Sequence, residues 1–176
     1  MEKISVNYLY DLKSKENMRL YYACKERFGE TLPDREAFIS QVTNELKEKL
    51  SGFSTIVIPQ SSNDFIFKIA SGLNKNLIIV KKNSIEKIIE EIPSLKLQKK
   101  EKDSHFERIT QMQGSFKINA LKANQRKKYQ YILFEKIEVP EKETSIILDD
   151  SCFSGTTKEA LSQATGVSNF MFIFSK

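Results

Sequence analysis

The chain has 176 residues, 40% of them hydrophobic, and its 28 basic and 23 acidic side chains give a formal net charge of +5. That length supports one ordinary core, and no apolar run approaches the roughly 20 residues that a transmembrane helix requires. One histidine and two distant cysteines, Cys24 and Cys152, exclude paired-histidine catalysis and a cysteine-based metal framework. The N-terminal residues do not resemble a signal peptide, so we expect a cytoplasmic protein with reduced thiols and no membrane partner.

The N-terminal residues, 1–52, predict a helical extension or hood. Apolar and polar residues alternate over 4–10, which favours a short strand, and a helix is expected over 14–28 with Gly29 at its end. Thr31-Leu-Pro-Asp opens a second helix, because proline is favoured in the first turn. The apolar residues that repeat every four positions along this second helix are Phe38, Val42, Leu46 and Leu50.

The remaining residues, 53–176, predict an α/β core. Short apolar runs typical of buried strands occur at 55–58, 76–80, 145–148 and 169–174. Helical stretches follow the first of these runs over 64–73 and the third over 156–164. Repeated strand-helix-strand units indicate a parallel sheet covered by helices, in which ligands bind beyond the carboxyl ends of the strands. Three loops should therefore meet at one edge of the sheet: 59–63, 81–82 and 149–157.

The long connection over 83–144 contains few periodic apolar residues. A helix is expected over 84–91 and a strand over 129–134. A structureless connection as long as 93–117 is uncommon inside a domain, and is usually functional or disordered. We predict that 93–117 is a flexible lid in which His105 is exposed to solvent.

The stretch 145–157, Ser-Ile-Ile-Leu-Asp-Asp-Ser-Cys-Phe-Ser-Gly-Thr-Thr, brings two acids to a turn of small hydroxyl residues. Backbone N–H groups at the start of the following helix can bind a phosphate, and Gly155 permits close approach. Carboxylates that faced the same phosphate would repel it. Asp149 and Asp150 should instead accept hydrogen bonds from hydroxyls of the same ligand, or hold a metal that does. A ribose carrying a 5-phosphate meets both requirements.

The same stretch resembles the phosphoribosyl-diphosphate signature of the type I phosphoribosyltransferase family, in which four apolar residues precede two acids and a loop of the kind Thr-Thr-Gly-Xaa-Thr. The likeness covers 144–176, and the elements over 55–80 match the diphosphate-binding unit of that family. It implies a type I phosphoribosyltransferase-like fold, with a variable hood and lid in the remaining residues. It also implies a role in nucleotide metabolism, by magnesium-dependent transfer of the 5-phosphoribosyl group from phosphoribosyl diphosphate to a nitrogenous base or amine acceptor, with release of diphosphate.

Carried over by position, the resemblance assigns a role to each loop. Asp149 and Asp150 would be the catalytic and metal-binding acids, since they would hold the ribose hydroxyls and Mg²⁺. The residues expected to bind the 5-phosphate are Ser154, Gly155, Thr156 and Thr157, and those expected to bind the diphosphate are Gln60, Ser61, Ser62, Lys81 and Lys82. The family also has a cis peptide in the diphosphate loop.

The sequence departs from the family pattern, and other interpretations stay open. Phe153 stands where the family commonly has a small hydroxyl residue, and it cannot donate to a phosphate. The chain could instead be a non-catalytic nucleotide sensor or a nucleic-acid-binding regulator of the same fold, although it lacks a nucleic-acid-reading motif. A hydrolase acting on the same ribose site is a third interpretation. The sequence identifies no acceptor, and it leaves open whether the chain forms a homodimer.

The chosen residues also have plainer interpretations. Asp149 and Asp150 could be solvated turn acids, and 59–63 an ordinary helix-capping turn. Lys81 and Lys82 could be a solvent-exposed pair. The tyrosines at positions 21 and 22 are expected in the core, because they lie at helical spacing.

Overall fold

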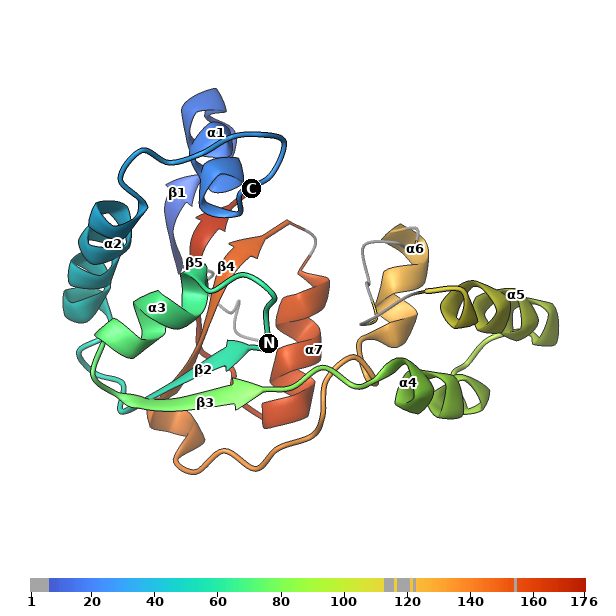
Figure 1. The fold of residues 1–176 in the computed structure, drawn as a ribbon. Coiled ribbons are helices and arrows are strands. Elements are labelled where there is room, and N and C mark those ends of the chain that lie inside the picture. The colour runs from blue at the N-terminus through green and yellow to red at the C-terminus, as the bar shows by residue number, and fades with distance from the viewer. Residues whose placement is uncertain (1–6, 113–115, 117–120, 122, 154) are drawn as a thin grey trace.

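The computed structural model describes residues 7–112, 116, 121, 123–153 and 155–176. Five strands form one sheet in the order β1-β5-β4-β2-β3, and every neighbouring pair is parallel (Figure 1). This confirms the predicted α/β architecture with a parallel sheet and flanking helices. The strands are β1 (Asn7–Asp11), β2 (Thr55–Pro59), β3 (Asn76–Val80), β4 (Ser145–Cys152) and β5 (Phe170–Ser175).

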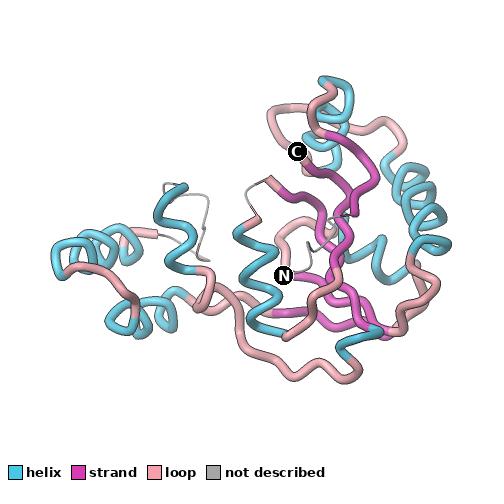
Figure 2. Tube along the Cα trace, turned by 180° about the vertical axis from the view of Figure 1, so that it is seen from behind, coloured by secondary structure: helices cyan, strands magenta, loops and turns pink. Residues whose placement is uncertain are grey.

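Helices surround this sheet on both faces (Figure 2). The helices are α1 (Lys15–Cys24), α2 (Arg35–Lys49), α3 (Phe65–Gly72), α4 (Ile85–Glu91), α5 (Lys99–Thr110), α6 (Ala123–Arg126) and α7 (Thr156–Thr165). Short 3-10 helices lie at η1 (Ile92–Ser94), η3 (Lys127–Tyr129) and η4 (Lys142–Thr144). Within the described part of the chain, none of the helices has the length and apolar character needed to cross a bilayer.

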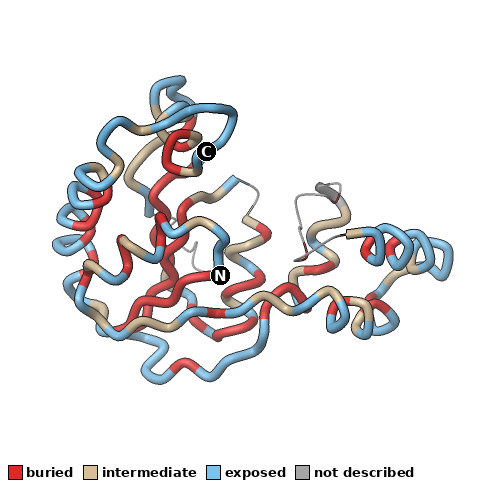
Figure 3. The backbone as a smooth tube through the Cα atoms, in the orientation of Figure 1, coloured by how far each residue is buried: buried red, intermediate tan, exposed pale blue. Residues whose placement is uncertain are grey.

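The sheet separates two hydrophobic clusters, because successive side chains of a strand point to opposite faces. In β2, Ile56 and Ile58 pack with residues of α1, α2 and α3. Val57, between them, packs on the other face with residues of α4, α5 and α7. All residues of β2 and β5 are buried, which explains their nearly continuous apolar sequence (Figure 3).

The direction of winding reverses between β2 and β4. From β2 the chain passes through α3 to β3 on one side, and from β4 it passes through α7 to β5 on the other. β2 and β4 are paired neighbours, so the loops that follow them open beside each other. Such a switch point leaves a crevice at the carboxyl ends of the strands, where open α/β sheets bind ligands.

The N-terminal residues contribute to the same sheet. β1 pairs in parallel with β5, and the N–H of Leu12 donates to the carbonyl of Ser175 at 2.7 Å. The predicted extension over 1–52 therefore includes an edge strand of the core as well as α1 and α2. Because β1 is parallel to the other strands, α1 begins at the carboxyl edge of the sheet.

β4 continues four residues beyond the apolar run that predicted it. Asp149 is paired with Phe172 of β5, and Cys152 is paired with Ser175. The two acids are therefore part of the strand, and the connection to α7 is shorter than the predicted loop 149–157. The sequence predicts that the strand ends at Leu148, because acids are unfavourable in a buried strand unless another group compensates their charge.

The prediction of a structureless connection at 93–117 is wrong for its described residues 93–112, which are largely helical. That this segment acts as a lid stays a prediction. α5 occupies Lys99–Thr110 and begins with a capping box, in which the side chains of Gln98 and Glu101 each accept a backbone N–H of the other residue. Only His105 and Ile109 are buried among the residues of α5. Its apolar stripe is therefore too sparse to be recognised by periodicity.

The predicted strand at 129–134 is also wrong, since these residues, all described, form the end of η3 and a turn. Tyr129 is fully buried, and its carbonyl accepts the N–H of Ile132 at 3.1 Å. Phe134 makes only an isolated antiparallel bridge with Lys82. The apolar run indicates a buried turn, which packs with α4 and α5 in the cluster beside α7.

His105 lies against Tyr129 of this buried cluster and is only 4% exposed, which corrects the expectation that solvent surrounds it. Its Nδ1 contacts the hydroxyl of Tyr129, and the two rings stack with their centroids 5.4 Å apart. Burial lowers the pKa of His105 from 6.5, and the charged groups around the ring are Glu101, Lys128 and Arg108.

Acidification is expected to destabilise the protein through His105. The pKa of this residue is 6.5 when unfolded and lower when folded, so below about pH 6.5 the unfolded chain binds a proton that the folded chain does not. The free energy of unfolding should therefore fall as the pH drops. Thermal denaturation at pH 7.5 and 5.0 should show a larger loss of Tm in the wild type than in His105→Gln. Equal losses in the two proteins would contradict this assignment.

Candidate functional site

A cleft of about 620 Å³ opens over the switch point between β2 and β4. It is bounded by the end of α1 and the turn after it, by loop 59–63 and by the start of α7. Residues that line it include Tyr21, Tyr22, Lys25, Arg27, Phe28, Gln60, Ser61, Ser62, Asn63, Lys82, Arg126, Asp149, Asp150, Phe153, Gly155, Thr157 and Lys158. The structure thus brings together most of the residues that the sequence predicted, and adds an N-terminal group.

Asp149 and Asp150 lie at the inner wall of this cleft and are nearly buried, at 7% and 9% exposure. Asp149 Oδ1 accepts the N–H of Asp150 at 2.8 Å, and Asp150 Oδ1 accepts the hydroxyl of Ser151 at 2.8 Å. They are therefore not solvated turn acids. Because they are successive residues of a strand, their side chains start from opposite faces of the sheet.

Lys25 is the ionic partner of Asp150. It caps the C-terminus of α1, and its Nζ donates to Asp150 Oδ2. The two side chains are 10% and 12% exposed, so the pair is largely removed from solvent. No local sequence pattern identifies Lys25 as a site residue, because 125 residues separate it from Asp150. Its position follows from the pairing of β1 with β5, which places α1 beside the end of β4.

Burial and charge act on Asp149 in the same direction. Burial, together with the neighbouring Asp150 carboxylate, raises the pKa of Asp149 from 3.8 to about 8, although Lys25 and Lys82 oppose the shift. Burial likewise lowers the pKa of Lys82, and this is partly offset by the two acids. An acid with a strongly raised pKa inside a cleft is typical of a functional site, since burying its carboxylate does not stabilise the fold.

Loop 59–63, at the end of β2, is held in place by hydrogen bonds to Val80 and Lys82 and by one within the loop. The N–H of Gln60 donates to the carbonyl of Val80 at 2.8 Å, and its side-chain oxygen accepts the N–H of Lys82 at 3.2 Å. Ser61 Oγ accepts the N–H of Asn63 at 3.2 Å. Every described peptide bond is trans, so the cis peptide expected from the family resemblance is not found in this loop.

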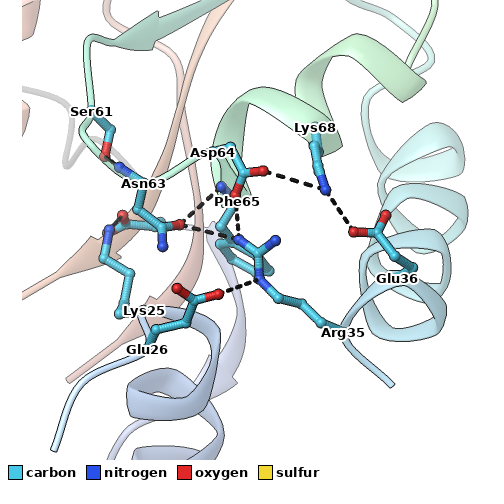
Figure 4. A network of polar contacts seen from close by, with 10 residues as sticks. Lys25, Glu26, Arg35, Glu36, Ser61, Asn63, Asp64, Phe65 and Lys68 are labelled. Carbon is cyan, nitrogen blue, oxygen red and sulfur yellow. Dashed lines mark hydrogen bonds and ion pairs between the residues drawn. The ribbon is translucent and has the colours of Figure 1, made fainter. Parts of the chain in front are cut away.

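A polar network ties loop 59–63 to the turn that follows α1 (Figure 4). Arg35 donates to Asp64 at 2.5 Å and to Asn63 at 3.4 Å, and its Nε lies 4.0 Å from Glu26. Lys68 continues the network by bridging Asp64 and Glu36. Arg35 thereby connects two sides of the cleft, because Glu26 is the neighbour of Lys25 and Asn63 belongs to the loop.

The connection between β4 and α7 provides the third side. Gly155 precedes the first turn of α7 with φ +72°, a left-handed conformation that favours glycine, and it has no side chain to cap the helix. Gly155 and Thr157 line the cleft, whereas Thr156 is buried and outside its lining. Ser154 lies outside the described residues. Gly155 and Thr157 thus place the N-terminus of α7 at the cleft, and the backbone of Gly155 also hydrogen-bonds the Cys152 side chain.

Only one of the two predicted lysines lies in the cleft. Lys82 lines it and is close enough to the acids to be affected by their charge. Lys81 is exposed and is not part of the lining, and its carbonyl accepts the N–H of Glu135 at 2.9 Å. The side chain of Lys81 therefore fits the interpretation of a solvated lysine.

Positive charge dominates the cleft. The basic side chains that line it are Lys25, Arg27, Lys82, Arg126 and Lys158, and they face only the two acids of β4 among the described residues. An excess of positive charge in a recess favours a ligand with several negative charges. Composition could not locate this excess, because the basic residues come from four separate parts of the sequence.

The acids could contribute to a magnesium site only together with a ligand. The described residues contain no group of three or more histidine, cysteine, aspartate or glutamate side chains able to hold a metal ion. Mg²⁺ at phosphate sites commonly uses one or two carboxylates, with substrate phosphates and water completing its shell. Asp149 and Asp150 meet this smaller requirement, provided that Asp150 exchanges Lys25 for the ion.

Comparison of the chain with protein-family models, with curated proteins and with solved structures finds no match.

Proposed function

We propose that the protein is a phosphoribosyltransferase, which transfers the 5-phosphoribosyl group from phosphoribosyl diphosphate to a nitrogenous base or amine acceptor. One observation carries the proposal. Asp149 and Asp150 line a basic cleft at the switch point, between loop 59–63 and the N-terminus of α7. These acids could accept hydrogen bonds from ribose hydroxyls, while loop 59–63 and the start of α7 could each bind one of the two phosphate-bearing ends of phosphoribosyl diphosphate.

Each side of the cleft would bind one part of the substrate. Backbone N–H groups at Gly155 and Thr157 would hold the 5-phosphate, which the dipole of α7 also favours. Asp149 and Asp150 would accept hydrogen bonds from the ribose hydroxyls. The leaving diphosphate would lie against loop 59–63 and Lys82. With these assignments the fold would be type I phosphoribosyltransferase-like, and the turn after α1 would be part of the hood.

The reaction proposed is a displacement at carbon 1 of the ribose. The acceptor nitrogen forms a bond to this carbon, the bond from carbon 1 to the diphosphate oxygen breaks, and diphosphate leaves with the electron pair. The acceptor nitrogen gives up its proton to solvent. Positioning and electrostatic stabilisation by the cleft provide most of the catalysis, since no side-chain nucleophile is needed. Bound Mg²⁺, held in part by Asp149 and Asp150, would neutralise charge on the diphosphate.

A second candidate function is a non-catalytic nucleotide sensor of the same fold. The ion pair between Lys25 and Asp150 favours it, because this contact engages one of the two acids that a transferase would use for the ribose hydroxyls and Mg²⁺. A sensor would bind a nucleotide through the same cleft without releasing diphosphate. A nucleic-acid regulator is less favoured, because the sequence has no nucleic-acid-reading motif with interleaved aromatic residues.

Calorimetric titration of phosphoribosyl diphosphate, with and without Mg²⁺, tests the proposal. The wild type should bind in a magnesium-dependent manner. The double variant Asp149→Asn/Asp150→Asn should bind roughly tenfold or more weakly, because the loss of even one charged hydrogen bond costs about 1.5–3 kcal/mol. Asp103→Asn, an exposed acid on α5, is the control and should bind as the wild type does. Folded wild-type protein that binds nucleoside monophosphates but not phosphoribosyl diphosphate would support the sensor instead.

A further inference from the structure

Both carboxylate oxygens of Asp150 already have donors in this cleft. Lys25 Nζ donates to Oδ2, and the hydroxyl of Ser151 donates to Oδ1 at 2.8 Å. Lysine side chains commonly extend their charged group into water, but that of Lys25 is only 10% exposed. The ammonium therefore lies where a metal ion bound by Asp150 would have to compete with it.

The backbone fixes the position of Lys25. Its N–H donates to two carbonyls in the last turn of α1, at 3.1 and 3.2 Å. The next residue, Glu26, has a left-handed φ of +51°, and its carboxylate lies 4.0 Å from Arg35 Nε. Arg35 in turn donates to Asn63 of loop 59–63 at 3.4 Å (Figure 4). Two walls of the cleft therefore hold the lysine in place, unlike a side chain on an open surface.

Stability alone does not account for the ion pair between Lys25 and Asp150. Removing two charged groups from water costs free energy, and buried ion pairs are often no more stabilising than apolar side chains of similar size. The pair lies in a cleft whose lining holds four other basic side chains among the described residues. A divalent cation entering alone would add positive charge to this recess and would have to displace the ammonium. A phosphate-bearing ligand that enters with the ion offsets that charge and offers Lys25 another anion.

We propose that Lys25 competes with the divalent cation, and keeps Asp149 and Asp150 from binding the ion unless a phosphate-bearing ligand is present. Lys25 is a positioning residue in this scheme, because it acts through Asp150 and not on the reacting atoms. The inference rests on the proposed function for the presence of the ion. It extends that function by making metal binding depend on the ligand, and it assigns this control to a residue at the end of α1.

Equilibrium dialysis against Mn²⁺ at pH 8, with and without inorganic diphosphate, tests the proposal. Without diphosphate, the wild type should retain no more Mn²⁺ than Asp149→Asn/Asp150→Asn does. Lys25→Met should bind Mn²⁺ at least about tenfold more tightly than the wild type, because no ammonium then opposes the ion at Asp150. With diphosphate, the wild type should retain Mn²⁺ as well.

Three further variants control for folding and for charge. Lys25→Gln can still donate to Asp150, so it tests the same expectation if Lys25→Met does not fold. Lys25→Arg keeps the positive charge and should behave as the wild type does. Lys158→Met removes another basic side chain of the lining, whose amine lies 4.9 Å from the centre of the Phe170 ring. It should raise the affinity for free Mn²⁺ far less than Lys25→Met. An equal rise in the two would overturn the proposal, since the general charge of the cleft would then explain it.

The remaining outcomes separate the proposal from the proposed function. Wild-type protein that binds free Mn²⁺ through the two acids overturns the proposal, and so does folded Lys25→Met or Lys25→Gln with no gain in affinity. Wild-type protein that retains no Mn²⁺ in the presence of diphosphate overturns it too, because the ligand then fails to admit the ion. None of these results depends on phosphoribosyl diphosphate, whose calorimetric titration decides the proposed function by itself.

Discussion

Asp149→Asn is expected to raise the free energy of unfolding at pH 7 and above. The pKa of Asp149 is about 8 in the folded protein and 3.8 in the unfolded chain. Between these values the folded protein keeps a proton that the unfolded chain has released, so its stability falls as the pH rises. The cost at pH 7 is at most about 4 kcal/mol, from roughly 1.4 kcal/mol for each pH unit above 3.8. Asparagine does not ionise, so Asp149→Asn avoids this loss of stability. The asparagine side-chain oxygen can still accept the N–H of Asp150.

Denaturant unfolding at pH 5.5, 7 and 8.5 measures this effect. The difference in free energy of unfolding between Asp149→Asn and the wild type should grow from pH 5.5 to 8.5, and the corresponding gain in Tm should be several degrees at neutral pH. The same variant should lose magnesium-dependent ligand binding. A variant that is less stable than the wild type at every pH would show that the carboxylate stabilises the fold. A residue that costs stability and is needed for binding is expected of a functional acid.

The second large effect is expected at Lys25. Lys25→Met removes one partner of a pair that is largely buried and leaves Asp150 with an uncompensated charge. We expect a loss of roughly 3 kcal/mol in the free energy of unfolding, which is typical of breaking such a pair. Lys25→Met/Asp150→Leu removes both charges and should recover most of the loss. A loss as large in the double variant as in Lys25→Met would contradict the pairing.

An exposed ion pair provides the control for Lys25. Lys87 on α4 lies 3.3 Å from Glu91, with side chains 51% and 36% exposed. Lys87→Met should change the free energy of unfolding by less than about 0.5 kcal/mol, because solvent screens such pairs. The contrast between the two lysines separates the effect of burial from the general effect of removing a charge.

The sequence predicts best where burial is continuous. β2 and β5 appear within one residue of their predicted positions, because strands covered on both faces have nearly unbroken apolar sequences. β3 matches its predicted range although it lies at the edge of the sheet and only Val80 of this strand is buried, since its sequence is also a short apolar run. α2 and α7 are also close to prediction, since proline or glycine marks their ends. These elements already place loop 59–63 and the start of α7 at one edge of a parallel sheet, which accounts for the predicted half of the cleft.

The failures have physical causes that local patterns do not contain. α5 is stabilised by a capping box and two buried side chains rather than by an apolar stripe, so its periodicity is weak. β4 continues through two acids because Lys25 and Lys82 partly compensate their charge. Lys25 itself lies at the site because β1 pairs with β5, and this pairing joins residues far apart in the sequence. The other half of the cleft, with Tyr22 and Phe28, depends on the same pairing.

The place of β5 in the sheet imposes an order on assembly. β5 is the last of the five strands to emerge during synthesis, yet it lies between β1 and β4. Until β5 joins the sheet, β1, the first of the five strands to be synthesised, has no neighbouring strand, and α1 cannot be fixed beside the acids of β4. The nascent chain would therefore expose an incomplete cleft, with Asp150 unpaired, until nearly all of these residues had left the ribosome. Contacts of such large sequence separation are slow to form, so completion of the cleft and completion of folding should coincide.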